Sequence, residues 1–211
     1  MKVISAAAQH NNGKDELCDF LIERLHELYQ HSWKRSAFAD PVKQTFCESF
    51  GVDRAFIEKW KRIPEPPPGF LMPVRQGLQF IGDGFRKIKD KIWIEIALRG
   101  QHNLIISDSR YINEAEAVRA VGGINILLFR PGFLNDDPNP SESQLKPLVE
   151  FAASKFEEGP LPSKEDLLAA GAPQGLDQYD YFLVNGGTVA DFRAKIKAKL
   201  VPWIAERFML S

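Results

Sequence analysis

The sequence predicts an α/β fold in which helices cover both faces of a parallel sheet. Short, continuous apolar runs alternate along the chain with longer segments of helical period, and such runs are typical of strands buried on both faces. The length of 211 residues suits one domain, expected to span residues 1–211, with a helical region at about 33–100 and an irregular insertion or lid at about 131–178.

The chain opens with a strand, a loop and a helix. Residues 2–7 predict the buried strand, and the helix is expected from Lys14 to Gln30. One face of that helix carries apolar residues at helical spacing: Leu17, Leu21, Leu25 and Leu28. Phosphate-binding loops occur at such strand-to-helix junctions, so the loop between the two elements is a candidate site.

This loop, AAAQHNNGKDE, half matches the phosphate-binding motif G-x-x-x-x-G-K-[ST]. Gly13 and Lys14 match it, whereas Ala8 stands at the first glycine and Asp15 at the hydroxyl residue. A helix start offers free N–H groups and partial positive charge to a phosphate, and a lysine adds a full charge. Because NNG is itself a good turn sequence, an ordinary turn explains the motif alone equally well.

Helices are expected in the next part of the chain. Asp40-Pro41 is a helix start, with Asp40 as the cap, and Asp53 is expected to cap a second short helix. A proline-rich loop, PEPPPGFLMP, follows these two helices. Two further helices are predicted after it, in VRQGLQFIGDGFRKIK and DKIWIEIALRG.

Strands return in the second half of the chain. Two buried strands are expected in NLIISDSR and INILLFRPG, and the helix between them would start with Asn113 as cap and Glu116 at the capping-box position. A last strand, DYFLVNGG, leads into the terminal helix. The expected apolar face of that helix consists of Val189, Phe192, Ile196 and Leu200.

Polar residues follow several of these strands. The carboxyl ends of parallel strands meet at one edge of a sheet, so the opening loop, Asp108 and Arg130 are expected to converge there. The carboxylate of Asp108 is a suitable ligand for Mg²⁺. Taken alone, Asp108 is better interpreted as an ordinary turn residue. The expected position of the opening loop beside it reverses this preference. Several cations lie near the expected ends of elements, and each one alone is best interpreted as a solvated surface residue. As a set they are suited to binding phosphate groups: Lys43, Arg75, Arg86, Arg110 and Arg130.

Composition argues against several classes of function. The formal net charge of -1 gives no basic field for nucleic acid or anionic lipid, and no apolar run reaches membrane-spanning length. The apolar part of MKVISAAAQ is too short for a secretion signal. Cys18 and Cys47 have no metal-ligand spacing and are interpreted as reduced packing residues, which favours a cytoplasmic protein.

Several segments match, in order, the motifs of one known family. NNGKDE resembles the family's S-G-K-D-T, and SAFADPVKQTFCESFGVD resembles its F-A-D-P-L-K segment. RQGLQFIGDGFRKIKDKIWIEIAL matches a segment with Arg, Leu-Gln, Gly, Arg and Trp in that order. IISDSRYINEAEAVRAVGG resembles a D-x-R-x-x-N-E segment, DDPNPSES resembles a D-D-H-P-S-E lid, and YDYFLVNGGTVADF resembles a D-x-x-I-x-N-x-G-T ending. Most of the chain thus resembles the deoxynucleoside monophosphate kinases of bacteriophages, a branch of the P-loop kinases.

The resemblance implies a P-loop kinase fold and transfer of the γ-phosphoryl group of ATP to a deoxynucleoside 5′-monophosphate, with Mg²⁺ as cofactor. Around ATP it implies Asn12, Gly13, Lys14, Asp15, Glu16 and Asn185. The catalytic residues that it implies are Lys14, Asp108, Arg110 and Arg130. The ligands of Mg²⁺ that it implies are Asp15 and Asp108. Around the monophosphate, within about 33–100, it implies Lys43, Arg75, Gln79 and Arg86. Arg130 and DDPNPSE would form the closing lid.

Ala8, Glu16 and Asn139 depart from the family pattern and leave two alternatives open. One is a nucleotide-binding protein that kept the fold and lost catalysis. The other is a kinase for a modified nucleotide or for a base in DNA, with a pocket built from Leu145–Gln178. The accepted base, the sugar preference and the oligomeric state, a homodimer included, also stay open. The expected partners are small-molecule nucleotides, without membrane or nucleic acid, in the host cytoplasm if the gene is a phage gene.

Overall fold

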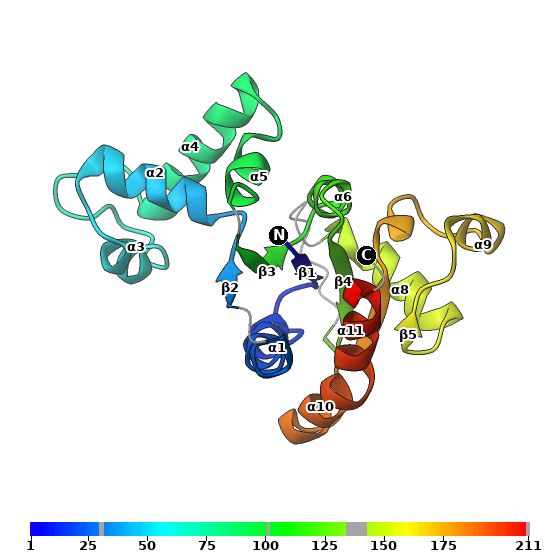
Figure 1. Cartoon of the computed structure of the whole chain (residues 1–211). Helices are drawn as coiled ribbons and strands as arrows, with labels where there is room; N and C mark the ends of the chain where they lie inside the picture. The colour runs from blue at the N-terminus through cyan, green and yellow to red at the C-terminus, as the bar shows by residue number, and fades with distance from the viewer. Residues whose placement is uncertain (30–31, 101, 134–142, 210–211) are drawn as a thin grey trace. The chain divides into compact units, whose positions relative to one another are not determined.

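The computed structural model describes residues 1–29, 32–100, 102–133 and 143–209. They form two compact units: one is Met1–Ser36 together with Gln101–Ser211, and the other is Ala37–Gly100. Figure 1 shows the elements of both units. The first unit contains the sheet and the loop that follows its first strand.

The first unit is built around a six-stranded sheet with the strand order β2-β3-β1-β4-β6-β5. Its strands are β1 (Val3–Ala7), β2 (Trp33–Ser36), β3 (Asn103–Ser109), β4 (Ile124–Phe129), β5 (Gly159–Pro160) and β6 (Tyr181–Val184). All neighbours pair in parallel except β5, which is antiparallel to β6. The predicted α/β fold is confirmed. The sequence patterns do not predict β2 and β5, because both are short edge strands with exposed residues.

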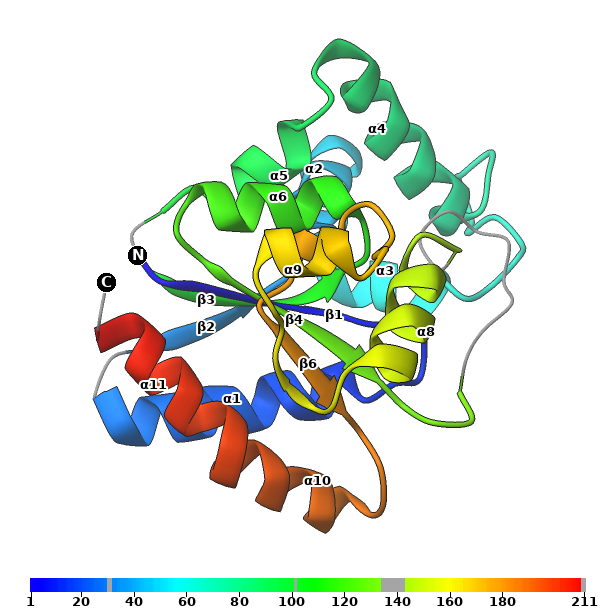
Figure 2. The same cartoon turned by 90° about the vertical axis from the view of Figure 1, so that its right-hand side faces the viewer.

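Helices cover both faces of this sheet (Figure 2). On one face lie α1 (Lys14–Tyr29), α10 (Val189–Lys195) and α11 (Val201–Met209); on the other lie α6 (Ile112–Ala120), α8 (Leu145–Lys155) and α9 (Lys164–Ala169). Along β1, Ala6 belongs to the hydrophobic cluster on the first face and Ala7 to the cluster on the second. Burial on both faces explains why the strands are nearly continuous apolar runs.

The packing face of α1 is as predicted for all but one of its leucines. Leu17, Leu21 and Leu25 are fully buried, but Leu28, in the last turn, is 57% exposed. Helical spacing identifies the side of the helix on which a residue lies, but it does not reveal how far the neighbouring elements extend. The prediction for Leu28 is therefore wrong although its position on the helix is right.

The terminal helix differs from the prediction in the same way. Val189, its first residue, is 59% exposed, whereas the other residues of the predicted apolar face are buried: Phe192, Ile196 and Leu200. The helix is also not continuous, since the π-helical turn η2 (Ile196–Leu200) separates α10 from α11. An extra residue in a turn leaves no clear mark in an amphipathic pattern, so the sequence did not reveal this change.

Two predicted helix caps are wrong. α6 begins at Ile112, so Asn113 lies inside the helix, and the carboxylate of Glu114, rather than Glu116, accepts a hydrogen bond from the Tyr111 N–H at 3.1 Å. α2 (Asp40–Phe50) contains Asp40 as its first residue, and the carboxylate of Asp40 accepts from the Ala37 N–H at 3.0 Å. In both places the helix boundary differs by a residue or two from the position that the cap motif suggests.

Residues 143–178 contain more regular structure than their turn-rich sequence predicts. Within this range, α8 buries Leu148 and Val149 and α9 buries Leu167, all in the cluster that covers the second face of the sheet. A short 3₁₀ turn, η1 (Leu176–Gln178), follows. Residues 145–178 are thus a packed part of the first unit. A role of the segment as a lid remains a prediction.

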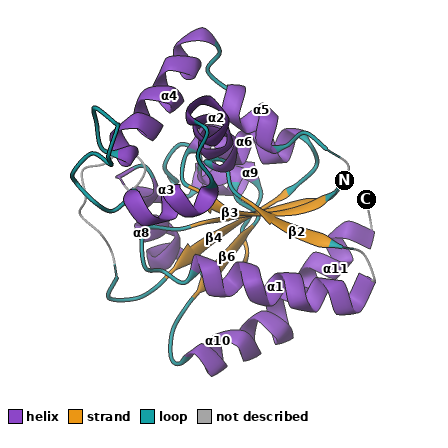
Figure 3. Cartoon of the chain, turned by 90° about the vertical axis from the view of Figure 1, so that its left-hand side faces the viewer, coloured by secondary structure: helices purple, strands orange, loops and turns teal. Residues whose placement is uncertain are grey.

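The second unit is helical, as predicted. Its elements are α2, α3 (Arg54–Trp60), α4 (Val74–Ile88) and α5 (Ile92–Ala97); Figure 3 shows them as helices joined by loops. Phe46 of α2 and Ile57 of α3 belong to its own hydrophobic cluster. Asp53 caps α3 as predicted, since its carboxylate accepts from the Phe56 N–H at 2.7 Å.

Both cysteines are free and buried, as the sequence predicts for packing residues. Burial raises the pKa of the Cys18 thiol to about 12, so this side chain is uncharged at neutral pH. None of the described helices combines the length and the apolar character needed to cross a membrane.

Candidate functional site

The loop between β1 and α1 is held in shape by the side chain of Asn12. This residue is only 3% exposed. Its Oδ1 accepts a hydrogen bond from the backbone N–H of Arg130 at 2.6 Å, directly after β4, and its Nδ2 donates to the carbonyl of His10 at 3.0 Å. The Asn12 side chain therefore joins the loop to the end of β4. In this structure the side chain supports the loop, and only the backbone of Asn12 remains to contact a phosphate.

A second connection joins the loop to the end of β6. The side-chain amide of Asn185 donates to the carbonyl of Asn12 at 2.9 Å. The next residue, Gly13, has φ +94, and a Cβ at this position would lie 2.4 Å from Asn185 Nδ2. Only glycine avoids both the backbone strain and the clash. The glycine of the half-matching motif is thus required by the geometry of the loop.

Lys14 follows as the first residue of α1, and its ammonium turns back into the loop. Its Nζ donates to the carbonyl of Ala8. Burial, helped by the charge of Arg110, lowers the pKa of Lys14 to about 8, although Asp108 and Asp15 act in the opposite direction. Because burial deprives this ammonium of water, an anion such as a phosphate would stabilise its charge.

The strand pairing brings the end of β3 beside this loop. Ala7 of β1 is paired with Ser109 of β3, so Asp108 and Arg110 flank the loop at the carboxyl edge of the sheet. Glu114, which is 7% exposed, fixes the backbone there, because its Oε2 accepts from the Arg110 N–H at 2.8 Å. The loop, Asp108 and Arg110 therefore lie together, and the strand ends predicted this for the loop and Asp108.

Arg130, at the end of β4, also lies against the loop. Its guanidinium is centred 3.9 Å from the ring of Phe133, and its NH1 is 3.4 Å from the carbonyl of Asn11. Four strand ends thus surround the loop: those of β1, β3, β4 and β6. The predicted lid motif DDPNPSE, at 136–142, lies outside the described residues.

The two acidic residues at the start of α1 are both paired with arginines. Asp15 forms an ion pair with Arg35 of β2, which also contacts Asp19 at 2.9 Å. Glu16 forms an ion pair with Arg193 of α10. These arginines offset negative charge that would otherwise repel phosphate. The sequence analysis missed Arg35 and Arg193.

The residues at this edge fit a magnesium–nucleotide complex in their donor chemistry. The part of the chain that the structure describes holds no group of three or more His, Cys, Asp or Glu able to enclose a metal ion. Mg²⁺ in nucleotide sites needs only one or two carboxylates, because phosphates and water complete its shell. Asp108 and Asp15 both act to raise the pKa of Lys14, so both carboxylates lie near it and are candidates for such ligands.

The residues predicted to bind the monophosphate lie in the second unit. Arg75, Gln79 and Arg86 fall on one face of α4, at helical spacing. Arg86 forms an ion pair with Asp83 at 3.1 Å. Lys43, on α2, has an ion pair of 3.5 Å with a glutamate of α3, Glu58. The structure thus groups the three residues of α4 as one polar face, and their binding role stays a prediction.

Comparison with known proteins gives one relative over nearly the whole chain. No family model matches the sequence. The chain is 26% identical over 216 residues to a protein of Acanthamoeba polyphaga mimivirus, whose name marks it as a proposed deoxynucleotide monophosphate kinase. The alignment covers 93% of this chain and 94% of that protein. The resemblance to such kinases is confirmed by this relative, while an origin in a bacteriophage is not, since the relative is from a mimivirus.

A solved structure of dephospho-CoA kinase from Campylobacter jejuni has a TM-score of 0.45 to this chain. It is 16% identical, and the match covers 98% of each chain.

Proposed function

We propose that this chain is an ATP-dependent kinase that phosphorylates deoxynucleoside 5′-monophosphates to diphosphates. The observation that carries the proposal is the position of Lys14, whose buried ammonium lies beside Asp108 and Arg110 in a loop held by glycine geometry. The viral relative of similar length supports the choice of a nucleotide as substrate. Phosphoryl transfer needs mainly positioning and charge compensation, and these residues can provide both.

The chain's own groups have distinct roles in this proposal. The N–H groups at the start of α1 and the Lys14 ammonium would hold the β- and γ-phosphates of ATP. Arg110 and Arg130 would offset the negative charge that builds up during transfer. Bound Mg²⁺ would neutralise phosphate charge, with Asp108 as its protein ligand and Asp15 as a second candidate. Asn185 would act on ATP indirectly, by fixing the loop.

The acceptor would bind to the second unit. A phosphate monoester needs cationic and amide donors, which Arg75, Gln79 and Arg86 supply from α4 and Lys43 supplies from α2. Arg130 and the 136–142 motif would close over the two nucleotides and keep water from the γ-phosphate. In this proposal residues 33–100 are the monophosphate-binding region and 131–178 contain the lid.

The departures from the family motif fit an active enzyme better than the sequence alone suggests. The methyl group of Ala8 is buried in the hydrophobic cluster on the α1 face, so it does not narrow the phosphate cradle. Glu16 is paired with Arg193 instead of standing as a bare charge. A modified nucleotide remains a candidate acceptor, whereas a base in DNA is disfavoured by the net charge of -1.

A coupled assay of ADP release, with ATP and each deoxynucleoside or ribonucleoside monophosphate in turn, tests the proposal. We expect turnover with at least one deoxynucleotide and its loss in Lys14→Ala. Lys155→Ala, which removes an exposed lysine at the end of α8, is the matched control and should keep full activity. Full activity of Lys14→Ala, or no turnover with any monophosphate, would reject the proposal.

A further inference from the structure

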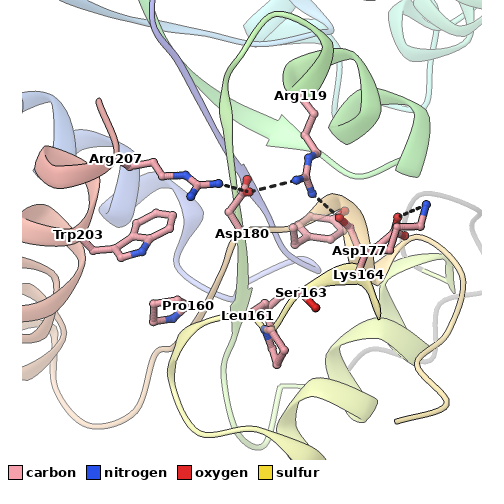
Figure 4. Close-up of a pocket in the computed structure, with 11 residues that line it drawn as sticks. Arg119, Pro160, Leu161, Ser163, Lys164, Asp177, Asp180, Trp203 and Arg207 are labelled. Atoms are coloured by element: carbon pink, nitrogen blue, oxygen red, sulfur yellow. Dashed lines mark hydrogen bonds and ion pairs between the residues drawn. The ribbon is translucent and has the colours of Figure 1, made fainter. Parts of the chain in front are cut away.

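A separate pocket lies at the amino ends of the strands, whereas the loop lies at their carboxyl ends. It has a volume of about 260 Å³ and is formed around Asp180, the residue directly before β6. The loop follows the carboxyl end of β1, whereas this pocket lies at the amino ends of β4 and β6, where Asp180 Oδ2 accepts from the Asn125 N–H at 2.8 Å. Figure 4 shows its lining, which comes from α6, α9, α11 and the β5 segment.

Cations outnumber carboxylates in the pocket lining. The cations are Arg119, Lys164 and Arg207, and the carboxylates are Asp177 and Asp180. Lys164 is paired with Asp177 at 3.3 Å. Two guanidinium groups therefore share the single carboxylate of Asp180, which leaves an excess of one positive charge for an anion to neutralise.

The two arginines are held loosely by that carboxylate. Arg119 NH2 lies 3.8 Å and Arg207 NH2 lies 3.9 Å from the same oxygen, Asp180 Oδ1, and both distances exceed that of a hydrogen bond. Arg119 has another partner, the backbone carbonyl of Asp177. Within the described part of the chain, Arg207 makes no hydrogen bond, so its N–H donors remain available to a ligand.

The rest of the lining is suited to an organic group. Trp203 forms one wall and is supported from behind by Tyr181, with ring centroids 5.0 Å apart. Figure 4 shows Trp203 beside Arg207, with Pro160 and Leu161 along the adjoining side. An aromatic ring, two apolar side chains and a pair of arginines together match a small molecule with an anionic end and an apolar or planar body.

We propose that this pocket binds a small phosphate ester, with its phosphate between Arg119 and Arg207 and its organic part against Trp203. A planar guanidinium pair can offer several parallel N–H donors to phosphate oxygens, and this geometry favours phosphate over a single halide ion. The pocket volume is large enough to hold one such compound. The site is distinct from the proposed ATP site, because it shares no residue with the loop or its partners.

Calorimetric titration of the full chain tests this site. Because phosphate would also bind the loop, the titrations use Lys14→Ala and the double variant Lys14→Ala/Arg207→Gln, with inorganic phosphate and phenyl phosphate as probes. We expect Lys14→Ala to bind both probes, phenyl phosphate more tightly, and the double variant to bind at least about tenfold more weakly. Lys14→Ala/Lys197→Gln removes an equal charge at an exposed position outside the pocket and should match Lys14→Ala.

Absence of binding in Lys14→Ala, or equal binding in both double variants, would overturn the proposal. Equal affinity for the two probes would overturn the assignment of an ester and leave a site for free phosphate. Arg207 is exposed and makes no hydrogen bond in the described structure, so Arg207→Gln should fold; Arg119→Gln provides a second variant if it does not. Thermal melting of each variant without ligand checks this point.

Discussion

The amide of Asn185, at the end of β6, donates a hydrogen bond to the carbonyl of Asn12 at 2.9 Å and thereby fixes the loop that follows β1. The same amide nitrogen occupies the space that a Cβ on Gly13 would need. Two residues 173 positions apart in the chain therefore determine the shape of the candidate phosphate cradle. The proposed function depends on this shape being maintained.

Gly13→Ala should destabilise the protein more than backbone strain alone would, because the new methyl group also clashes with Asn185. Gly122, which also has a positive φ and has nothing within 4 Å of a built Cβ, serves as the control for strain. We expect Gly13→Ala to lower the free energy of unfolding by about 1 kcal/mol or more beyond Gly122→Ala, measured by urea denaturation. In an Asn185→Ala background that excess should vanish. An unchanged excess would show that the clash with Asn185 is not its cause.

Activity should fall as Lys14 loses its proton. Burial lowers the pKa of Lys14 to about 8, so the free enzyme carries a largely neutral amine above that pH, and a neutral amine cannot attract phosphate. We expect kcat/KM for ATP to fall by about tenfold per pH unit above pH 8. Lys14→Arg, which stays charged, should lose this basic limb. A profile that is flat to pH 10, or the same limb in Lys14→Arg, would contradict the assignment.

The depressed pKa of Lys14 also predicts the pH dependence of stability. The unfolded lysine, with a pKa of 10.5, binds its proton more tightly than the folded one, so this group opposes folding below about pH 8. The free energy of unfolding should therefore rise between pH 8 and 10.5 in the wild type relative to Lys14→Met. Denaturation curves across that range measure it, and parallel curves for the two proteins would argue against a buried ammonium.

Arg35 should matter for ATP because it compensates Asp15. Removing Arg35 leaves the Asp15 carboxylate unpaired beside the phosphates, so Arg35→Gln should raise the KM for ATP by about threefold to tenfold, with little change in stability because the pair is exposed. Asp15→Asn in the Arg35→Gln background should restore the KM. Loss of activity in Asp15→Asn alone, whether or not Arg35 is present, would instead identify Asp15 as a ligand of Mg²⁺.

Glu114, and not Glu116, should be needed to hold the backbone that follows β3 in place. Glu114→Ala removes the acceptor for the Arg110 and Tyr111 N–H groups, so we expect a loss of about 1–2 kcal/mol of stability and a lower kcat. Glu116 is exposed, and Glu116→Ala should be close to neutral in both measurements. Equal effects of the two substitutions would contradict the assignment of this role to Glu114.

Strand-end reasoning predicted which residues lie beside the loop. Asp108 and Arg130 were expected beside the loop because each follows a buried apolar run, and the parallel sheet places both runs next to β1. The same reasoning predicts four of the six strands of the first unit, β1, β3, β4 and β6, and misses the short edge strands β2 and β5. It succeeds because long apolar runs and their polar ends are local features that a sequence displays directly.

The supporting contacts could not be predicted in this way. Arg193 is 177 positions from Glu16, and Arg35 lies on a short edge strand without a clear pattern. Glu114 was missed because the start of α6 differs from the expected position. Asn12 and Asn185 lie in turn-like sequence, where nothing local indicates that one amide will bond the other. Such contacts depend on tertiary packing, which periodicity does not encode.

The most direct test of the central claim is the transfer of label from [γ-³²P]ATP to each deoxynucleoside monophosphate, followed by separation of the nucleotides. The account predicts labelled deoxynucleoside diphosphate from the wild-type chain and none from Lys14→Ala. Label that appears only as inorganic phosphate, or labelled diphosphate formed equally by Lys14→Ala, would contradict it.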